Sequence, residues 1–119
     1  MAESVRQKKV ADRVKKLVSV VIDRKVNDPD KGFVTITHVK MSPDLRIASI
    51  YFTAFGDAAV AKKSLNALER AKNFIRNEIA PELKMRFLPE LRFFVDDTQE
   101  YARQIGRLLD DMNKEDDEI

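Results

Sequence analysis

The stretch AKNFIR, residues 71–76, is central to the prediction of the fold because it interrupts an otherwise regular helical pattern. Apolar residues recur with a period of about 3.6 residues on both sides of it. They are Ala61, Leu65 and Leu68 before the stretch, and Ile75, Ile79 and Leu83 after it. A single straight helix would place Lys72 in the middle of this stripe. Since asparagine adopts the left-handed conformation more readily than most residues, we expect two helices that meet at a kink at Ala71-Lys72-Asn73.

An amphipathic helix is predicted before this region, near the start of the chain. Its apolar stripe has the helical period and consists of Val10, Val14, Leu17, Val18, Val21 and Ile22. This helix must end before residues 27–32, a cluster of turn-forming residues, because Pro29 disfavours the helical conformation at Asp28.

Two strands are predicted between the helices. Residues 33–41 are rich in β-branched side chains, but their alternation changes parity, so we expect a bulge near Thr37 or His38. Residues 47–53 alternate regularly with Ala48, Ile50 and Phe52 on one face. Because the connection between the strands is short, an antiparallel pair is expected.

The remaining elements complete an α+β order. Asp57 is expected to cap the second helix, and Pro81 is expected to bend or restart the helical region near Ala80. A third strand is predicted at residues 91–96 and a last helix from Asp97 or Thr98 to about Met112, so the sheet has three strands. Residues 1–112 then form a single domain, and the acidic residues 113–119 form a tail that is expected to fray.

The composition limits the kind of protein. A chain of 119 residues with 44% apolar residues fits one folded domain. The absence of cysteine excludes disulfides, thiolate metal sites and cysteine nucleophiles, and it suits a reducing cytosol. No signal-peptide pattern is present, and no apolar run approaches the roughly 20 residues needed to cross a bilayer. We therefore expect a soluble protein without a membrane partner.

Charge is distributed unevenly along the chain. Residues 93–119 carry 3 basic and 9 acidic side chains, which leaves 19 basic and 11 acidic side chains in residues 1–92. The body is thus basic and the end is acidic, and this asymmetry favours a polyanionic partner for the body. The alternative is an ordinary solvated surface with a solubilising tail.

Signals for catalysis are weak. His38 is the only histidine, and no nucleophile motif accompanies it; an edge histidine at a bulge explains it better. Glycine occurs only at positions 32, 56 and 106, so neither a dinucleotide fingerprint nor a phosphate-binding loop is present. Residues 28–39 begin like a calcium loop but lack its required glycine and glutamate. We expect no enzymatic activity and no metal site.

Signals for nucleic-acid binding are stronger. Lys72 and Arg76 are four residues apart, so they can face the same side, and Lys84 and Arg86 follow soon after. A helix that begins near Phe74 would also present free N–H groups to an anion. Contacts of this kind give affinity for phosphates without reading sequence. The alternative is that Lys72 and Arg76 are solvated helix charges.

Two phenylalanines are ambiguous. Phe74 and Phe94 could stack on bases, as aromatic side chains do in many RNA-binding proteins. Phenylalanines at such positions are more typically part of the core, and we interpret both as core residues.

The order helix–strand–strand–helix–kink–helix–strand is similar to that of a type II KH domain, although the GXXG loop of KH domains is missing. The chain instead resembles the ribosome-binding factor A family, in which an Ala-x-Gly kink replaces that loop. The resemblance covers about residues 5–112, and five segments carry it. They are residues 27–29, residues 34–42, the turn Ser42-Pro43-Asp44-Leu45 together with Ala48 and Tyr51, residues 71–76, and residues 88–93. Asn73 departs from the family by replacing the kink glycine, and Asp30 stands where a basic residue often follows Asp-Pro.

This resemblance implies a function. It implies a monomeric cytoplasmic factor that binds the immature small ribosomal subunit and its rRNA. It also implies support for late maturation and 5′-end processing of small-subunit rRNA, with a link to growth in the cold. No cofactor, small-molecule substrate or catalysis is implied.

The binding residues are predicted from the charges and the expected kink. We expect contacts to folded rRNA from Lys72, Asn73, Arg76, Lys84 and Arg86, with further phosphate contacts from Arg6, Lys9 and Arg13. One alternative is a protein-interaction adaptor that acts on a ribosomal or other complex without touching RNA, and another is a DNA-binding regulator. The acidic residues 115–118 are expected to compete with RNA for the basic face.

Overall fold

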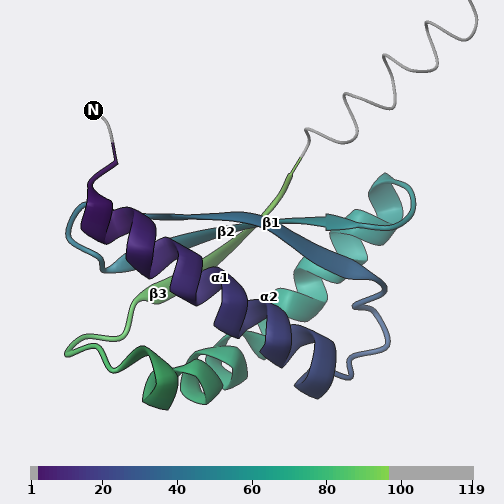
Figure 1. Cartoon of the computed structure of the whole chain (residues 1–119). Coiled ribbons are helices and arrows are strands. Elements are labelled where there is room, and N and C mark those ends of the chain that lie inside the picture. Colours follow the sequence, from purple (N-terminus) through teal and green to yellow (C-terminus); the bar gives the residue numbers. More distant parts are fainter. Residues whose placement is uncertain (1–2, 97–119) are drawn as a thin grey trace, which may run out of the picture.

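The computed structural model describes residues 3–96, which form two helices and a three-stranded sheet (Figure 1). The elements are α1 (Val5–Lys25), β1 (Val34–Met41), β2 (Ile47–Ala54), α2 (Ala58–Leu83) and β3 (Glu90–Val95). The predicted α+β class and the order of these elements are confirmed. The predicted last helix and the tail at residues 113–119 lie outside the described residues.

The first helix has the predicted apolar stripe. Val14, Val18 and Ile22 are buried along one side of α1. Its start is fixed by a capping box, in which the Ser4 hydroxyl accepts the Gln7 N–H and the Gln7 side chain accepts the Ser4 N–H. The helix ends at Lys25, before the predicted turn cluster at residues 27–32.

The sheet has the order β1-β2-β3. β1 and β2 are antiparallel, and their register shifts between Ile36 and His38, so the predicted bulge is confirmed. β2 and β3 are parallel, with Ile50 opposite Phe93. A parallel pair requires a long crossover connection, and α2 provides it.

Both helices cover the same face of the sheet (Figure 1). Burial alternates along β2, with Ala48, Ile50 and Phe52 fully buried toward the helices. On the opposite face, the rings of His38, Tyr51 and Phe94 stack in a row across the three strands. Their centroids are 4.2 Å apart for the first pair and 5.3 Å apart for the second.

The second helix differs from the prediction. α2 is a single helix of 26 residues, so the break at residues 71–73 and the new helix near Phe74 were wrong. Ala71 fills the apolar stripe between Leu68 and Ile75, while Lys72 lies beside the stripe and forms an ion pair with Glu69 at 2.6 Å. The lysine therefore stays out of the core without a break in the helix.

The end of α2 is also simpler than expected. Asp57 caps its start as predicted, by accepting the Val60 N–H. Pro81 is accommodated inside the last turn, so the helix does not restart near Ala80 but continues to Leu83. Lys84 then ends it in a left-handed conformation, with φ of 52°.

The interpretation of two phenylalanines as core residues was wrong. Phe74 is 44% exposed on α2, and Phe94 is 41% exposed on the uncovered face of the sheet. Neighbouring residues take the buried positions instead, namely Ile75 on the helix and Phe93 on the strand. The alternation of β3 thus turns Phe94 outward.

Candidate nucleic-acid interface

Three segments meet at one end of the molecule: the first half of α1, the β1–β2 turn, and the loop from α2 to β3. The Gln7 side-chain amide donates to the Met41 carbonyl at 3.1 Å, which joins α1 to the turn. The Arg13 guanidinium donates to the Glu82 carbonyl and joins α1 to the end of α2. The Glu90 N–H donates to the Arg46 carbonyl at 2.8 Å. These bonds hold the three segments together.

The β1–β2 turn is built by its own side chains. The Asp44 carboxylate accepts a hydrogen bond from the Ser42 hydroxyl at 2.6 Å and from the Arg46 N–H at 3.1 Å. These two bonds, the Ser42 bond first, lower the pKa of Asp44 below its ordinary value, so the carboxylate is charged at neutral pH. Leu45 adopts a left-handed conformation with φ of 61°.

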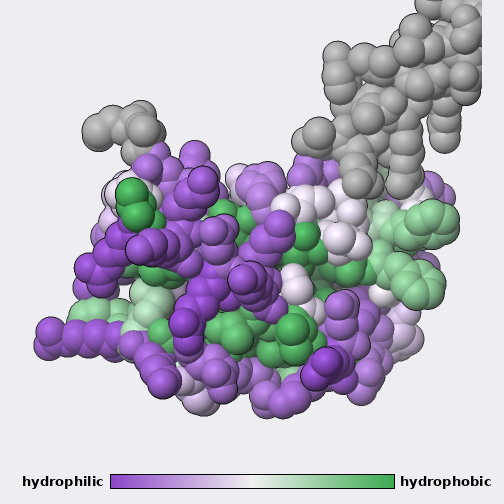
Figure 2. Space-filling model, in the orientation of Figure 1, coloured by the Kyte–Doolittle hydropathy of each residue, from purple (hydrophilic) through white to green (hydrophobic). Residues whose placement is uncertain are grey.

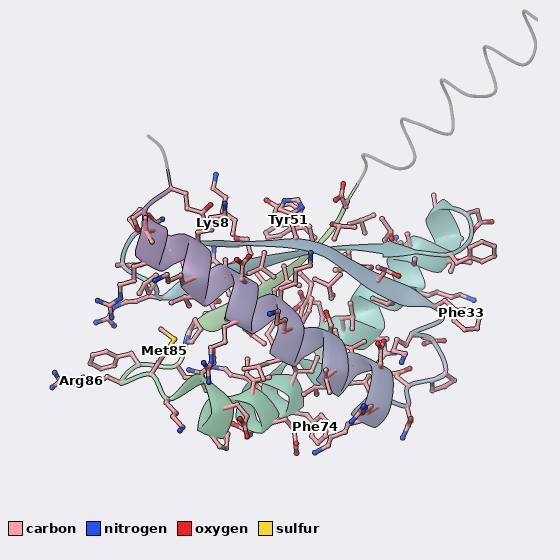
Figure 3. All side chains as sticks on the ribbon, viewed as in Figure 1. Lys8, Phe33, Tyr51, Phe74, Met85 and Arg86 are labelled. Carbon is pink, nitrogen blue, oxygen red and sulfur yellow. The ribbon has the colours of Figure 1, made fainter. Side chains whose placement is uncertain are left out.

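A cavity of about 250 Å³ opens where these segments meet, and we call it the basic pocket. It is lined by Arg6, Asp44, Leu45, Arg46, Lys84, Met85, Arg86 and Phe87. Figure 3 shows Met85 and Arg86 at this end of the molecule. Four cations therefore surround the cavity, and Asp44 is the single carboxylate among its lining residues. Within residues 3–96, no salt bridge engages any of these four cations.

Phe87 is the centre of a cation–π cluster in the pocket. The guanidinium carbon of Arg46 lies 4.7 Å from the centroid of the Phe87 ring, and that of Arg86 lies 5.5 Å from it. The ring is 55% exposed, so it contributes little to the core. A guanidinium that stacks on a ring keeps its N–H groups at its edge, where they can bind phosphate or a base.

The backbone is unusual at the same place. Among residues 3–96, Leu45 and Lys84 are the two non-glycine residues with positive φ, and both line the basic pocket. A non-glycine residue in this conformation costs about 1–2 kcal/mol. Residues held in such conformations concentrate at functional sites, where the surrounding structure maintains them.

Five of the eight predicted binding residues lie at this end. Arg6, Lys84 and Arg86 line the basic pocket itself. Lys9 and Arg13 line a neighbouring shallow groove along α1. Their joint placement follows from the packing of α1 against the end of α2, which the sequence pattern did not specify.

The other three predicted residues lie elsewhere. Lys72 pairs with Glu69, and Asn73 is exposed in the middle of α2. Arg76 donates to the carbonyls of Leu88 and Pro89 at 3.0 and 3.1 Å, so it holds the loop that carries the pocket residues. Because α2 continues through Phe74, the expected helix N-terminus is not available there.

Arg46 and Phe87 were missed from the sequence. Arg46 directly follows the Ser42-Pro43-Asp44-Leu45 turn, and Phe87 directly follows Arg86. Alternation of arginine with an exposed aromatic residue is a signal for nucleic-acid contact. However, the two residues are 41 positions apart, and only the folded chain brings them into contact.

A second cluster of charges has a structural role. The Arg70 guanidinium binds the carboxylates of Asp28 and Asp30, with its closest ion-pair distances at 2.9 and 3.1 Å. The pKa of Asp28 is lowered, first by a hydrogen bond from the Asp30 N–H and then by Arg70. This cluster fixes residues 27–30 against α2.

Two exposed phenylalanines lie side by side at the opposite end of the molecule, which we call the aromatic end. Phe33 and Phe55 are 82% and 78% exposed and are neighbours, since the Phe55 N–H donates to the Phe33 carbonyl at 3.0 Å. Figure 2 shows a pale green projection at this end, where Figure 3 labels Phe33. Exposed apolar side chains that cluster in this way are candidates for partner contacts.

Residues 3–96 contain neither a cluster of metal ligands nor a membrane-spanning helix. No group of three or more potential metal ligands lies together in this part of the chain. Neither of the two helices described is long and apolar enough to cross a bilayer.

Comparisons with known proteins agree on one family. The family model for ribosome-binding factor A matches residues 6–109. The ribosome-binding factor A of Macrococcus caseolyticus is 38% identical over 112 residues, which span 94% of this chain and 98% of that protein. That of Trichlorobacter lovleyi is 44% identical over 104 residues, which span 87% and 85% of the two chains.

Structural comparison gives the same result. The crystal structure of ribosome-binding factor A from Thermus thermophilus aligns with a TM-score of 0.67 and 27% identity, over 75% of this chain and 94% of that chain. A homology model of the Thermus thermophilus factor, fitted into a cryo-EM map of a 30S–RbfA complex, aligns with a TM-score of 0.60 and 29% identity, over 72% and 90% of the two chains. The chain described here belongs to the ribosome-binding factor A family.

Proposed function

We propose that this chain binds the small ribosomal subunit and contacts its rRNA through the basic pocket. Membership of the family supports subunit binding, as does the similarity to a protein fitted into a 30S complex. The finer role proposed is assistance in late maturation of the subunit and in 5′-end processing of its rRNA, in the cytoplasm. In this role the protein acts as a monomeric binding factor without catalysis of its own.

The single observation that carries the RNA contact is the convergence of four cations on one cavity. Arg6, Arg46, Lys84 and Arg86 come from three segments, and within residues 3–96 they have no salt-bridge partner. Four like charges held close together repel one another, and a polyanion offsets that repulsion. Phosphates of rRNA meet this need, and their binding releases counterions, which adds affinity at low salt.

The position of the rRNA contact differs from the one expected from the sequence alone. Lys9 and Arg13 extend the basic pocket along α1, whereas Lys72 and Asn73 lie on a separate part of α2. Arg76 is proposed as a positioning residue for the loop at residues 84–89. Cations bind phosphates without reading bases, so selectivity for one site on the subunit comes from rRNA shape.

The test is co-sedimentation of purified protein with isolated small subunits across a range of salt concentrations. The double variant Lys84→Glu/Arg86→Glu is expected to lose about tenfold or more in affinity and to show a shallower dependence on salt. The double variant Lys62→Glu/Lys63→Glu changes the same number of charges on exposed residues early in α2, and it is expected to bind nearly normally. Equal binding by the two variants would overturn the proposed site.

A protein-interaction adaptor is the second candidate function, and the exposure of Phe33 and Phe55 favours it. An apolar contact to a ribosomal protein predicts weak dependence on salt. In that case, Phe33→Ser/Phe55→Ser would abolish co-sedimentation, and charge reversal at the basic pocket would leave it unchanged.

A further inference from the structure

We infer that the basic pocket holds one unpaired RNA nucleotide, with its base stacked on the Arg46–Phe87–Arg86 cluster and its phosphate bound by Arg6 and Lys84. This inference rests on the proposed function and deepens it, because it states which element of rRNA the site recognises. Contact to an unpaired base is distinct from contact to the backbone of a duplex.

The first argument is the planar surface. Phe87 is more than half exposed, yet two guanidinium groups lie against its ring at 4.7 and 5.5 Å from the centroid. Guanidinium and phenyl groups both present flat faces, and RNA bases stack on each of them. A site that only binds phosphates requires no aromatic ring, so Phe87 points to a base.

The second argument is size. The cavity has a volume of about 250 Å³. This lies below the range of about 300–1,000 Å³ that is typical of pockets for drug-sized ligands. The cavity suits a single base that enters from solvent. A base can enter it only after leaving the RNA helix. Paired bases in A-form RNA are held in the stack and present mainly sugars and phosphates to the protein.

The third argument is the division of charge within the pocket. Arg6 and Lys84 come from the start of α1 and the end of α2 and can bind a phosphate together. Asp44 lies on the wall formed by the β1–β2 turn, where its carboxylate repels a phosphate but accepts N–H groups of a base. The lining of the pocket therefore includes cations that suit a phosphate and a carboxylate that suits a base edge.

The fourth argument is backbone geometry. Leu45 and Lys84 line the pocket from left-handed conformations, with φ of 61° and 52°. Glycine would adopt these conformations without strain, but it would supply neither the apolar wall nor the cation. The loop that carries Met85, Arg86 and Phe87 is fixed in turn by the bonds from Arg76 to the Leu88 and Pro89 carbonyls. The pocket is thus preorganised, which lowers the cost of binding.

The test compares the affinity of the full chain for two RNA probes at one salt concentration, a short single-stranded oligoadenylate and a blunt-ended, fully paired RNA duplex. Phe87→Leu keeps the charge and most of the apolar volume but removes the ring. We expect it to lose about tenfold in affinity for the oligoadenylate, with little change for the duplex. Phe87→Tyr retains a ring and is expected to restore binding to the oligoadenylate.

Phe33→Leu makes the same change at the exposed aromatic end, and it is expected to leave both affinities unchanged. Thermal unfolding of each variant establishes that it is folded. The inference is overturned if Phe87→Leu weakens both probes equally or neither. If it has no effect while Lys84→Glu/Arg86→Glu still weakens co-sedimentation with the small subunit about tenfold or more, the nucleotide pocket is wrong and the proposed function stands.

Discussion

The turns near the two ends of α2 both contain residues with positive φ, but the residue types differ. At the aromatic end, the positive-φ positions are Gly32 and Gly56, with φ of 63° and 138°. At the basic pocket, the positive-φ positions are Leu45 and Lys84. Glycine is the usual choice for a left-handed turn because it lacks a Cβ. We infer that the turns at the aromatic end serve only the fold, whereas those at the basic pocket also keep side chains that can contact a partner.

The largest expected change in the free energy of unfolding is at the aromatic end. A Cβ added at Gly56 would lie 2.9 Å from Cγ2 of Val60, and the backbone conformation there disfavours any side chain. Gly56→Ala is therefore expected to lower the free energy of unfolding by about 2–3 kcal/mol. At Gly32 the new methyl group would make only ordinary contacts, the nearest at 3.6 Å to Oγ of Ser64. Gly32→Ala should therefore cost only about 1 kcal/mol. Chemical denaturation measures both, and equal values for the two would contradict the steric argument.

At the basic pocket, a smaller change in the free energy of unfolding is expected, and it is an increase. Lys84→Gly relieves the left-handed strain and is expected to raise the free energy of unfolding by about 0.5–1 kcal/mol, after allowance for the greater freedom of glycine in the unfolded chain. The same variant is expected to bind small subunits less tightly, because it removes a cation.

Lys84→Ala separates these two effects. It also removes the cation but keeps the Cβ and hence the strain, so it should lose affinity without gaining stability. Co-sedimentation and chemical denaturation of both variants test the prediction. Normal subunit binding by Lys84→Gly would mean that the lysine serves only to cap α2.

The order of the elements was predictable because its signals are local. The apolar stripe of α1, the change of parity in β1 and the cap at Asp57 depend on residues a few positions apart, and each was confirmed. The predicted break into two helices was wrong because the prediction relied on the position of Lys72 relative to a straight stripe. Ala71 is small enough to continue the stripe, and Glu69 pairs with the lysine at its edge.

The candidate site was less predictable because it is assembled from distant segments. The charges of Arg6, Lys84 and Arg86 could be read from the sequence, but their meeting in one cavity depends on the packing of α1, the β1–β2 turn and α2. Arg76 shows the reverse case. Its spacing from Lys72 suggested a phosphate contact, yet it donates to two backbone carbonyls that only the folded loop brings within reach.

The smallest expected effect is on the stability of two loops in acid. Each loop is held against α2 by one arginine, Arg70 at one end and Arg76 at the other. Arg70 binds the carboxylates of Asp28 and Asp30, whereas Arg76 binds carbonyl oxygens that do not titrate. The pKa of Asp28 in the folded protein lies below its ordinary value of 3.8. Its contribution to stability is therefore present above that value and is lost as the pH falls through the lower, folded pKa.

Acid should consequently loosen residues 27–30 before residues 84–89. Amide hydrogen exchange measured at neutral pH and again below the ordinary pKa of aspartate tests this order. Arg70→Met is expected to raise the pKa of Asp28 only part of the way to its ordinary value, because the Asp30 N–H is the larger cause of the shift. An NMR titration of the Asp28 carboxyl measures this change. Equal loosening of both loops in acid would show that the Arg70 cluster does not set the stability of its loop.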